Sequence, residues 1–561
     1  MPESTSGPGS GQVGRWPLVP FDDRLAAALA AAPADAVAVV DEDAQPPRAV
    51  TFEQLRAMVD SFRAQVVALG VGPGHLVPIL ARPSPECVAL VLALLRERAA
   101  FCVLNERFTA VERADLVERM QPVGLVVDAP GAALITPEDG PESGPEHGHA
   151  PILLEVAGTT RPAGWSHPVL SVAAPIAPPS PRSGSSAFDG IAHAHFSSGS
   201  TGGPKAVLGT REGLSHFADV QIDGCGLTAA DRLLCIVGFG SNLGLVQIFS
   251  ALFSGASLHL TRARDRALGE IIRRAGITGL GGSTPLWTAA LAASAGHETL
   301  FGDVPTLRYI STGGLHMPRT RFRELIARLG GGVAVYEIFG QAEVRQMTHF
   351  PISAAEHTPR FESVGRAVAG SHLFVALDEE TVAPVGAVGE VAHWGPGVMA
   401  GYLGRPELTA SVLRTHAAFP GRTVVYTGDL GYQDHEGYVF LKGRESRAVH
   451  LEDGRTVWPA AVEDALATFP GVTDAIAVGV AAGAWAGGRT VLAAAVVAAG
   501  DVDPVAVREH AATRLPAQAV PVHIAVWPAL PSTPNGKPAV ALITSRLATE
   551  LDVELSDDRA G

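Results

Sequence analysis

The length, composition and charge of the chain exclude several classes of protein. The chain has 561 residues, of which 47% are hydrophobic and 18% are charged, so it is too long for one core and too apolar for a disordered chain. Its formal net charge of −15 argues against a nucleic-acid-binding protein, because such proteins need a basic surface. The four cysteines lack CxxC spacing, the start lacks a basic and apolar leader, and no apolar run reaches the roughly 20 residues of a membrane span. We therefore expect a cytoplasmic protein of several structural units that does not bind membranes.

The first part of the chain predicts a large α/β domain over residues 17–443. It follows a Gly/Ser/Pro-rich segment, residues 1–16, which we expect to be a disordered tail. Residues 129–187 are also dense in Pro, Gly and Ser and favour surface loops. Strand and helix signals alternate early in the domain, which is typical of a largely parallel sheet. These signals are a strand at Ala36–Val40, a helix at Thr51–Leu69, a strand at Val77–Leu80 and a helix at Pro85–Arg98.

The last part of the chain predicts a small α+β domain over residues 447–550. A polar run, Gly443–Arg447, marks its boundary, and an acidic tail at 551–561 follows it. About 100 residues is an ordinary size for one structural unit. The expected elements are a helix at Trp458–Phe469, strands at Ala475–Val480 and Val491–Ala498, and a helix at Pro504–Leu515.

A glycine-rich segment at residues 195–205, HFSSGSTGGPK, directly follows a predicted strand at Ile191–Phe196. Its glycines allow the backbone to approach a ligand closely, while its hydroxyl groups and Lys205 supply donors and a positive charge. This combination predicts a loop that binds the β- and γ-phosphates of a nucleotide. A flexible linker is the alternative. A Walker loop is excluded, because Pro204 precedes the lysine and no Ser or Thr follows it.

The segment resembles the Ser/Thr/Gly-rich phosphate loop of the adenylate-forming superfamily, which includes acyl-CoA synthetases, luciferases and the adenylation domains of nonribosomal peptide synthetases. Further motifs of that superfamily follow in order, so that the resemblance covers about residues 20–545. They are FGQAE at 339–343, GEVAHWGPGVMAGYL at 389–403, YTGD at 426–429 and PSTPNGK at 531–537. The resemblance implies a large N-terminal domain of packed, parallel-type sheets, joined by a hinge near Ser446 to a small mobile C-terminal domain.

The resemblance also implies roles for individual residues. Phe339 would stack on adenine, Glu343 would bind Mg²⁺, and Asp429 and Arg444 would contact the ribose. Lys537 would reach from the small domain to the substrate carboxylate and the α-phosphate. The implied catalytic set is Lys537, Lys205, Thr201 and Glu343. The implied ATP-binding set is Ser197, Ser198, Gly199, Ser200, Thr201, Gly202, Lys205, Gly314, Glu337, Phe339, Gly340, Asp429 and Arg444.

The segment Ser241–Gly255 aligns with the acid-binding helix of the superfamily. Members that activate α-amino acids have an aspartate where this chain has Asn242. A neutral amide does not compensate a buried ammonium group, so Asn242 favours an aryl acid or another non-amino acid. The other residues implied for this pocket are largely apolar and include no acid, and a plain core role is the alternative for several of them. They are Leu243, Val246, Leu286, Ile310, Thr312, Ile338, Gln346 and Met347.

We predict ATP- and Mg²⁺-dependent activation of a carboxylic acid as an acyl-adenylate, with release of pyrophosphate. Transfer to the phosphopantetheine thiol of a carrier protein in natural-product biosynthesis would follow. The carrier would be a separate protein, because this chain has no Gly-x-Asp-Ser carrier signature. An amide synthetase, an acyl-CoA ligase and a nucleotide-binding pseudoenzyme remain alternatives. Ala342, Ser446 and His450 depart from the superfamily pattern.

Two histidines, His193 and His195, alternate along the predicted strand before the loop, with no third ligand nearby in the sequence. A structural zinc site needs four ligands. We therefore interpret both histidines as bystanders rather than as metal ligands.

Overall fold

The computed structural model describes residues 19–106, 108–120, 122, 125–130, 151–154, 169–170, 188–197, 205–263, 266–294, 297–481, 490–533 and 537–557. The expected tail at 1–16 and most of the expected loop segment at 129–187 lie outside these residues. Within that segment, β6 and β7 are strands of a sheet, so part of it is regular where loops were expected.

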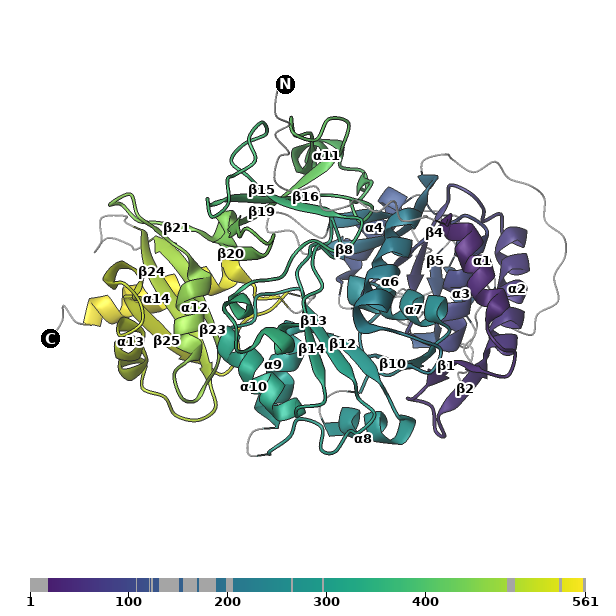
Figure 1. The fold of residues 1–561 in the computed structure, drawn as a ribbon, viewed down its shortest axis with the longest axis horizontal. Coiled ribbons are helices and arrows are strands. Elements are labelled where there is room, and N and C mark those ends of the chain that lie inside the picture. Colours follow the sequence, from purple (N-terminus) through teal and green to yellow (C-terminus); the bar gives the residue numbers. More distant parts are fainter. Residues whose placement is uncertain are drawn as a thin grey trace, which may run out of the picture.

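Two large, mostly parallel sheets form the frame of the N-terminal domain (Figure 1). In the seven-stranded sheet, only β2 pairs antiparallel with its neighbour. In the eight-stranded sheet, β9 and β17 are added to one edge by antiparallel pairing. The first sheet has the order β14 (Ala334–Ile338), β13 (Tyr309–Gly313), β12 (Gly279–Ser283), β10 (Arg232–Cys235), β11 (Ser257–Leu260), β1 (Val37–Asp41) and β2 (Arg48–Thr51). The second has the order β17 (Gly401–Tyr402), β9 (Lys205–Thr210), β8 (Ile191–Ser197), β4 (Ala100–Val103), β3 (Leu76–Leu80), β5 (Leu125–Val127), β6 (Pro151–Leu154) and β7 (Val169–Leu170).

The main core lies between these two sheets, because one buried cluster joins residues of both sheets to a layer of helices. The helices of this layer are α1 (Phe21–Ala31), α2 (Phe52–Ala68), α3 (Pro85–Arg96), α6 (Arg211–Cys225) and α7 (Asn242–Ser254). A second cluster covers the outer face of the seven-stranded sheet with α8 (Arg266–Ala275), α9 (Thr284–Ala293) and α10 (Arg319–Leu329). The outer face of the eight-stranded sheet packs against α4 (Ala110–Met120).

A third, five-stranded sheet lies at the top of the molecule in Figure 1, above the seven-stranded sheet. Its strands are β15 (His372–Ala376), β16 (Gly389–Trp394), β19 (Val424–Gln433), β18 (Leu413–Arg414) and β20 (Val439–Arg444). The neighbouring short elements are α11 (Pro406–Val412) and the 3₁₀ turns η2 (Ile352–Ala355), η3 (Pro359–Glu362) and η4 (Glu445–Arg447). Since β20 ends at Arg444 and η4 includes Ser446, the chain leaves the large domain directly from this sheet.

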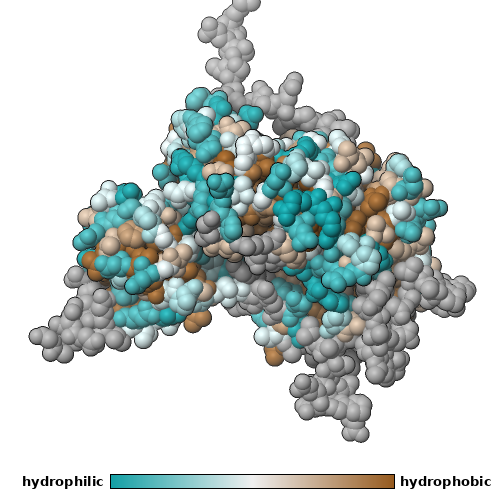
Figure 2. Space-filling model, turned by 90° about the horizontal axis from the view of Figure 1, so that it is seen from below, coloured by the Kyte–Doolittle hydropathy of each residue, from teal (hydrophilic) through white to brown (hydrophobic). Residues whose placement is uncertain are grey.

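The small domain forms a separate lobe, which is visible at the left of Figures 1 and 2. Its three-stranded sheet carries one apolar cluster on each face, with α12 and α13 on one side and α14 on the other. Its elements are β21 (Val449–His450), β22 (Thr456–Val457), α12 (Pro459–Ala467), β23 (Val472–Ala481), β24 (Thr490–Ala498), α13 (Pro504–Ala512), η5 (Ala517–Ala519), β25 (His523–Trp527) and α14 (Val540–Asp557).

The expected α/β fold with a small α+β domain is confirmed, and the differences lie at the ends of elements. Helix α2 begins where the sequence predicts a helix, because the Thr51 side chain accepts from the Gln54 N–H and the Gln54 side chain accepts from the Thr51 N–H. Helix α3 ends at Arg96 rather than Arg98, since Arg98 has a left-handed φ of 58°. Helix α14 continues to Asp557, so the segment expected to be an acidic tail starts inside a helix.

Candidate active site

The two ends of the predicted phosphate loop are held side by side in the eight-stranded sheet. Ser197 is the last residue of β8, Lys205 is the first residue of β9, and the two are paired across the antiparallel strands. Most loop residues predicted to bind phosphate lie outside the described residues, as does the side chain of Ser197. These loop residues are Ser198, Gly199, Ser200, Thr201 and Gly202.

The predicted magnesium ligand, Glu343, lies beside Lys205 through a shared neighbour, Tyr402. The Tyr402 hydroxyl donates to Glu343 Oε1 over 2.6 Å, and the Lys205 ammonium lies 5.8 Å from the centre of the Tyr402 ring. Burial, and then the nearby charge of Glu343, raises the pKa of Tyr402, so that its hydroxyl keeps its proton and remains a donor. Lys205 and Glu343 therefore lie near the same tyrosine although they are far apart in the sequence.

The predicted ribose ligand, Asp429, is held by donors on both carboxylate oxygens. Arg444 Nε donates to Oδ1 over 2.9 Å, and Gln341 Nε2 donates to Oδ2 over 2.8 Å. Asp429 and Arg444 are direct partners in the β19–β20 pairing. Because each carboxylate oxygen has two lone pairs, Asp429 still has acceptor capacity for ligand hydroxyls.

Lys537 comes from the small domain and lies against this group of residues. The pKa of Lys537 is lowered mainly by burial and then by the charge of Arg444, while Glu343 and Asp429 oppose the shift. Charges act on each other appreciably only within about 10 Å, so the Lys537 ammonium lies within electrostatic range of Arg444, Glu343 and Asp429. The main-chain N–H of Thr533 donates to the Lys537 carbonyl over 2.7 Å.

The remaining residues of the predicted ATP-binding set lie near the same strand ends but differ in role. Gly314 follows β13 with a φ of 93° and has open space where a Cβ would be, so it leaves room for a ligand. At Gly340, a Cβ would meet the Arg345 carbonyl at 1.9 Å, so only glycine fits. Phe339 is partly buried. The Glu337 carboxylate accepts from Arg319 Nη1 over 2.7 Å, which commits it to an ion pair inside the protein.

The predicted acid-binding residues fall on two faces of the seven-stranded sheet. Leu243 and Val246 belong to α7, which packs in the layer between the sheets. Ile310 and Thr312 alternate with Ser311 along β13 and face α9, where Thr284 Oγ1 lies 3.5 Å from Thr312 Oγ1. The structure therefore does not bring the whole predicted set together.

The other members of that set lie at three further places. Leu286 packs against the outer cluster near Gly282. Ile338 ends β14 opposite Gly313. Met347 is fully buried in the cluster beneath the five-stranded sheet, which is the arrangement expected of a core residue.

Two side chains of the set are polar and buried without hydrogen-bond partners. Asn242 Oδ1 and both amide atoms of Gln346 contact no donor or acceptor among the described residues. An unmet buried polar group costs about 1–3 kcal/mol. Such groups are commonly satisfied by a ligand or by water, which keeps Asn242 and Gln346 as candidates for substrate contact.

Sequence reasoning missed three residues of the site. Gln341 and Tyr402 stand inside recognised motifs, but their partners, Asp429 and Glu343, are 88 and 59 residues away in the sequence. Their positions inside motifs were the only sequence signal for Gln341 and Tyr402. That signal did not indicate which residue either of them contacts. Arg345 carried no signal at all.

Arg345 lies deep beside the two histidines that the sequence analysis set aside. Its Nη1 is 2.9 Å from His193 Nε2, and a Cβ at Gly209 would lie 2.1 Å from its Nη2. Burial lowers the pKa of Arg345 to about 9 and that of His195 to about 3. His195 is therefore neutral, and the described residues include no group of three or more side chains suited to hold a metal ion.

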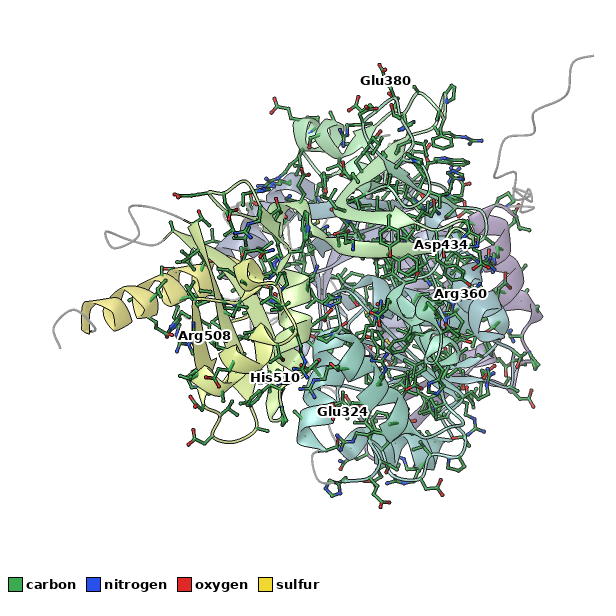
Figure 3. The ribbon with its side chains drawn as sticks, turned by 60° about the vertical axis from the view of Figure 1, so that its left-hand side comes forward. Glu324, Arg360, Glu380, Asp434, Arg508 and His510 are labelled. Atoms are coloured by element: carbon green, nitrogen blue, oxygen red, sulfur yellow. The ribbon has the colours of Figure 1, made fainter. Side chains whose placement is uncertain are left out.

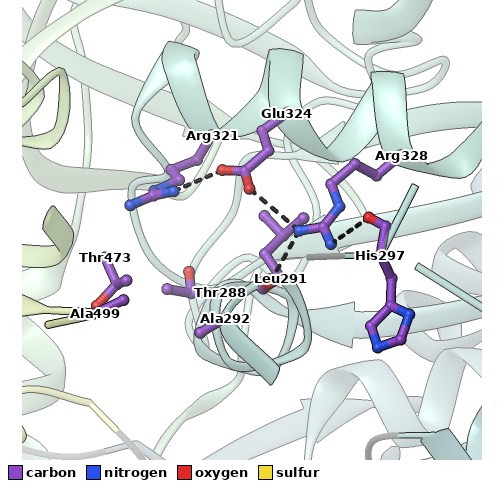
Figure 4. Close-up of a pocket in the computed structure, with 9 residues that line it drawn as sticks. All are labelled: Thr288, Leu291, Ala292, His297, Arg321, Glu324, Arg328, Thr473 and Ala499. Atoms are coloured by element: carbon purple, nitrogen blue, oxygen red, sulfur yellow. Dashed lines mark hydrogen bonds and ion pairs between the residues drawn. The ribbon is translucent and has the colours of Figure 1, made fainter. Parts of the chain in front are cut away.

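A pocket of about 420 Å³ lies elsewhere, between α9 and α10 of the large domain and two residues of the small domain (Figure 4). Glu324 joins Arg321 and Arg328 across one wall of this pocket. None of the predicted site residues lines it, so it is separate from the candidate active site. Figure 3 shows Glu324 on the large domain, facing the lobe that carries His510.

Comparisons with known proteins identify the family to which the chain belongs. The sequence profile described as "AMP-binding enzyme" matches residues 25–403, and the profile described as "AMP-binding enzyme C-terminal domain" matches residues 461–537. The chain belongs to the AMP-binding enzyme family, within the adenylate-forming superfamily. It is an AMP-forming acid ligase, an enzyme that forms acyl-adenylates.

The relatives of the chain differ in length and in the activity that their names state. The chain is 28% identical to an indoleacetate–CoA ligase of Aromatoleum aromaticum over 497 residues, covering 88% of this chain and 92% of that one. It is 26% identical to tyrocidine synthase 3 of Brevibacillus parabrevis over 494 residues, which is 87% of this chain but only 7% of that much longer protein. An amide bond synthetase from Marinactinospora thermotolerans has the same fold, with a TM-score of 0.77, 24% identity and coverage of 94% and 99% of the two chains.

Among the helices that the structure describes, none combines the length and the hydropathy that crossing a membrane requires.

Proposed function

We propose that the chain uses ATP and Mg²⁺ to activate a small, non-amino carboxylic acid as its acyl-adenylate. The acyl group is then passed to the phosphopantetheine thiol of a separate carrier protein in natural-product biosynthesis. One observation carries the first half of this proposal. Lys537 of the small domain is largely buried and lies within electrostatic range of Glu343, Asp429 and Arg444 of the large domain, which supports one charged site built from both domains.

The residues of this site fit the parts of a nucleotide. Asp429 keeps acceptor capacity for ribose hydroxyls, while Arg444 and Gln341 fix its orientation. Lys205 stands at the mouth of the phosphate loop. Phe339 offers an aromatic face, and Gly314 leaves open space beside it for a base and a sugar.

Glu343 is suited to hold a magnesium ion. Mg²⁺ is usually bound through one or two carboxylates together with phosphate oxygens. The Tyr402 hydroxyl occupies one lone pair of Oε1, and no bond from another described residue uses Oε2. When bound, the ion would neutralise phosphate charge next to Lys205.

The reaction needs positioning and charge neutralisation more than covalent help from the protein. A carboxylate oxygen attacks the α-phosphorus of ATP and forms a new oxygen–phosphorus bond. The bond from that phosphorus to the pyrophosphate oxygen breaks, and pyrophosphate leaves with the electron pair. Lys537 balances the charge of the attacking carboxylate, and Lys205 balances that of the departing group.

The lysine content of the chain supports these two roles. Only three of its 42 basic residues are lysines, namely Lys205, Lys442 and Lys537. A compact ammonium group acts as a point charge that fits a crowded site, whereas the planar fork of arginine does not replace it. In a chain that otherwise uses arginine, two of the three lysines lie in the proposed site.

The acceptor is the less constrained part of the proposal. His450 lies on β21 at the surface and shares a contact with Thr456, so the small domain keeps a polar edge that a rotation could bring to the site. Coenzyme A is the alternative acceptor, because the indoleacetate–CoA ligase is similar over nearly its whole length. A free amine, as in an amide synthetase, is the third.

Exchange of labelled pyrophosphate into ATP, measured with a panel of carboxylic acids, tests the first half of the proposal. Lys537→Ala should lower the acid-dependent exchange rate about tenfold to a hundredfold, because a hydrogen bond to a charged group contributes about 1.5–3 kcal/mol. Lys442→Ala is the matched control, since Lys442 lies on exposed β20 and should leave the rate unchanged. An unchanged rate in Lys537→Ala would remove this residue from the mechanism.

Trapping with phosphopantetheinylated carrier protein, coenzyme A or an amine panel then identifies the acceptor. Acyl transfer to the carrier at a higher kcat/KM than to the other two would support the proposed acceptor. Faster transfer to coenzyme A or to an amine would contradict the carrier proposal and would identify that compound as the acceptor. Nucleotide binding without exchange for any acid would indicate a pseudoenzyme.

A further inference from the structure

Arg345 carries a buried positive charge that no carboxylate balances among the described residues. The residue is 5% exposed. Burial lowers the pKa of its guanidinium, and no neighbouring acidic side chain acts to raise it. A charge that is buried without a partner is strongly unfavourable. The protein therefore keeps this arginine at a cost, which calls for a reason beyond packing.

The backbone of Arg345 carries a second cost. Its φ is 61°, in the left-handed region that residues other than glycine rarely adopt. This conformation closes a tight loop, because the Arg345 N–H donates to the Gln341 carbonyl over 2.6 Å. The Arg345 carbonyl lies so close to Gly340 that a Cβ there would meet it at 1.9 Å. Unfavourable positions of this kind cluster at functional sites.

The guanidinium connects this loop to the two strands that hold the phosphate loop. Its Nη1 lies 2.9 Å from His193 Nε2 on β8. Because a guanidinium can only donate, His193 Nε2 is the acceptor. A Cβ at Gly209 of β9 would lie 2.1 Å from Nη2, so the guanidinium lies directly against that strand. Since β8 ends at Ser197 and β9 begins at Lys205, Arg345 contacts both strands that flank the phosphate loop.

The loop closed by Arg345 carries two side chains of the candidate active site. Gln341 Nε2 donates to Asp429 Oδ2 over 2.8 Å, and Glu343 Oε1 accepts from the Tyr402 hydroxyl over 2.6 Å. A magnesium ion bound by Glu343 would also have to reach phosphate oxygens. The distance between this loop and the strands of the phosphate loop therefore decides whether one ion can contact both.

We propose that Arg345 is a positioning residue that ties the loop carrying Gln341 and Glu343 to the strands of the phosphate loop. It acts through His193 and β9, and not by a contact of its own with the nucleotide. This inference rests on the part of the proposed function that concerns ATP and Mg²⁺.

Calorimetric titration of the enzyme with ATP, with and without Mg²⁺, tests the proposal. In the wild type, Mg²⁺ should tighten ATP binding, because the ion joins Glu343 to the phosphates. Arg345→Met should reduce this gain about tenfold, since residues that orient a metal ligand contribute about tenfold to a hundredfold to metal affinity. Its unfolding temperature should be equal to that of the wild type or higher, because the lost charge had no partner.

His193→Leu keeps the test decisive if Arg345→Met folds poorly. It removes the acceptor of the guanidinium and should reduce the Mg²⁺ gain in the same direction. The double variant should lose no more of the gain than Arg345→Met alone, because both changes act through one contact. In pyrophosphate exchange, the KM for ATP should rise about tenfold in Arg345→Met, at the lower end of the same range, while the KM for the acid should stay unchanged.

Arg211→Met is the matched control. Arg211 is 8% exposed, but its Nη1 donates to Asp22 Oδ1 over 2.7 Å, so its charge is balanced. Removing one partner of such a pair leaves the other charge unpaired. Arg211→Met should therefore lower the unfolding temperature and leave the Mg²⁺ gain unchanged.

The outcomes separate this inference from the function on which it rests. An unchanged Mg²⁺ gain in both Arg345→Met and His193→Leu would overturn the positioning role and leave adenylation intact. A fall in unfolding temperature as large as that of Arg211→Met would do the same, because it would show a purely structural arginine. A wild-type enzyme that exchanges pyrophosphate with no acid would instead overturn the proposed function, while the titrations would still decide the role of Arg345.

Discussion

Asp429 is the residue whose contacts make the sharpest prediction at the residue scale. Its two oxygens accept from Arg444 and Gln341, and its own N–H donates to the Thr427 hydroxyl over 3.1 Å. Asp429→Asn would place an amide N–H opposite one of these donors and would remove one acceptor for ribose. We expect the KM for ATP to rise about tenfold to a hundredfold, since a hydrogen bond to a charged group contributes about 1.5–3 kcal/mol.

The measurement is the ATP dependence of pyrophosphate exchange, accompanied by direct titration of ATP. Asp434→Asn serves as the control, because the Asp434 carboxylate also accepts two hydrogen bonds, but from main-chain N–H groups in the β19–β20 turn. If both variants raise the KM equally, the effect comes from the strand pair and not from the ribose contact.

At this scale the sequence predicted which residue types matter but not their partners. The FGQAE and YTGD motifs were recognised, yet the bond between Gln341 and Asp429 depends on how two distant strands meet. A sequence pattern could likewise not predict the ion pair of Glu337 with Arg319. Side-chain partners are set by the tertiary fold, so only the structure gives them.

At the scale of elements, most helices and strands were predictable because their signals are local. The Thr51 capping box, the buried run of α3 and the alternation along β8 each depend on a few neighbouring residues. The order of strands within each sheet was not predictable, since pairings such as β1 with β11 join distant segments. The same limit explains why Leu243 and Ile310 were expected in one pocket although they lie on opposite faces of a sheet.

One contact between the two domains, formed by His316 just before α10 and by Asp464 of α12, should depend on pH. His316 Nε2 lies 2.8 Å from Asp464 Oδ1 at this interface. Burial lowers the pKa of His316, but the bond to Asp464 and its charge outweigh that effect, so the pKa is raised overall. The contribution of the pair is therefore present below the ordinary histidine pKa of about 6.5 and is lost as the pH rises through the raised value.

We expect the closed arrangement to loosen over this range, as measured by protease cleavage near Ser446. The His316 side chain is 39% exposed, so solvent screens the pair and the change should stay below about fivefold. His316→Gln should abolish this dependence, and Arg321→Lys should not. A pH dependence that persists in His316→Gln would show that another group controls the interface.

At the scale of the whole molecule, the sequence predicted two domains, and the resemblance implied that they would share one site, but not which side chains would surround Lys537. The family motifs implied that Lys537 reaches the large domain, and the profile matches agree with a separate C-terminal unit. Its position beside Arg444 is visible only in the assembled structure. That position also has an energetic consequence, because a cation loses hydration when the lobes close over it.

Lys537 should make closure of the empty enzyme depend on alkaline pH. Burial, with Arg444 as the second cause, lowers the pKa of Lys537 in the closed arrangement. In an open arrangement its pKa would be near the ordinary value of about 10.4. The closed form therefore binds its proton less tightly, and raising the pH through the lowered pKa favours closure. Without nucleotide, the closed fraction should increase as the pH approaches 10.4 from below. Energy transfer between dyes on the two domains measures the closed fraction.

Lys537→Met should be closed to the same extent across this pH range, while Lys442→Met should respond as the wild type does. Equal slopes in the wild type and in Lys537→Met would mean that the ammonium does not oppose closure, and that anionic ligands do not close the lobes by pairing with it.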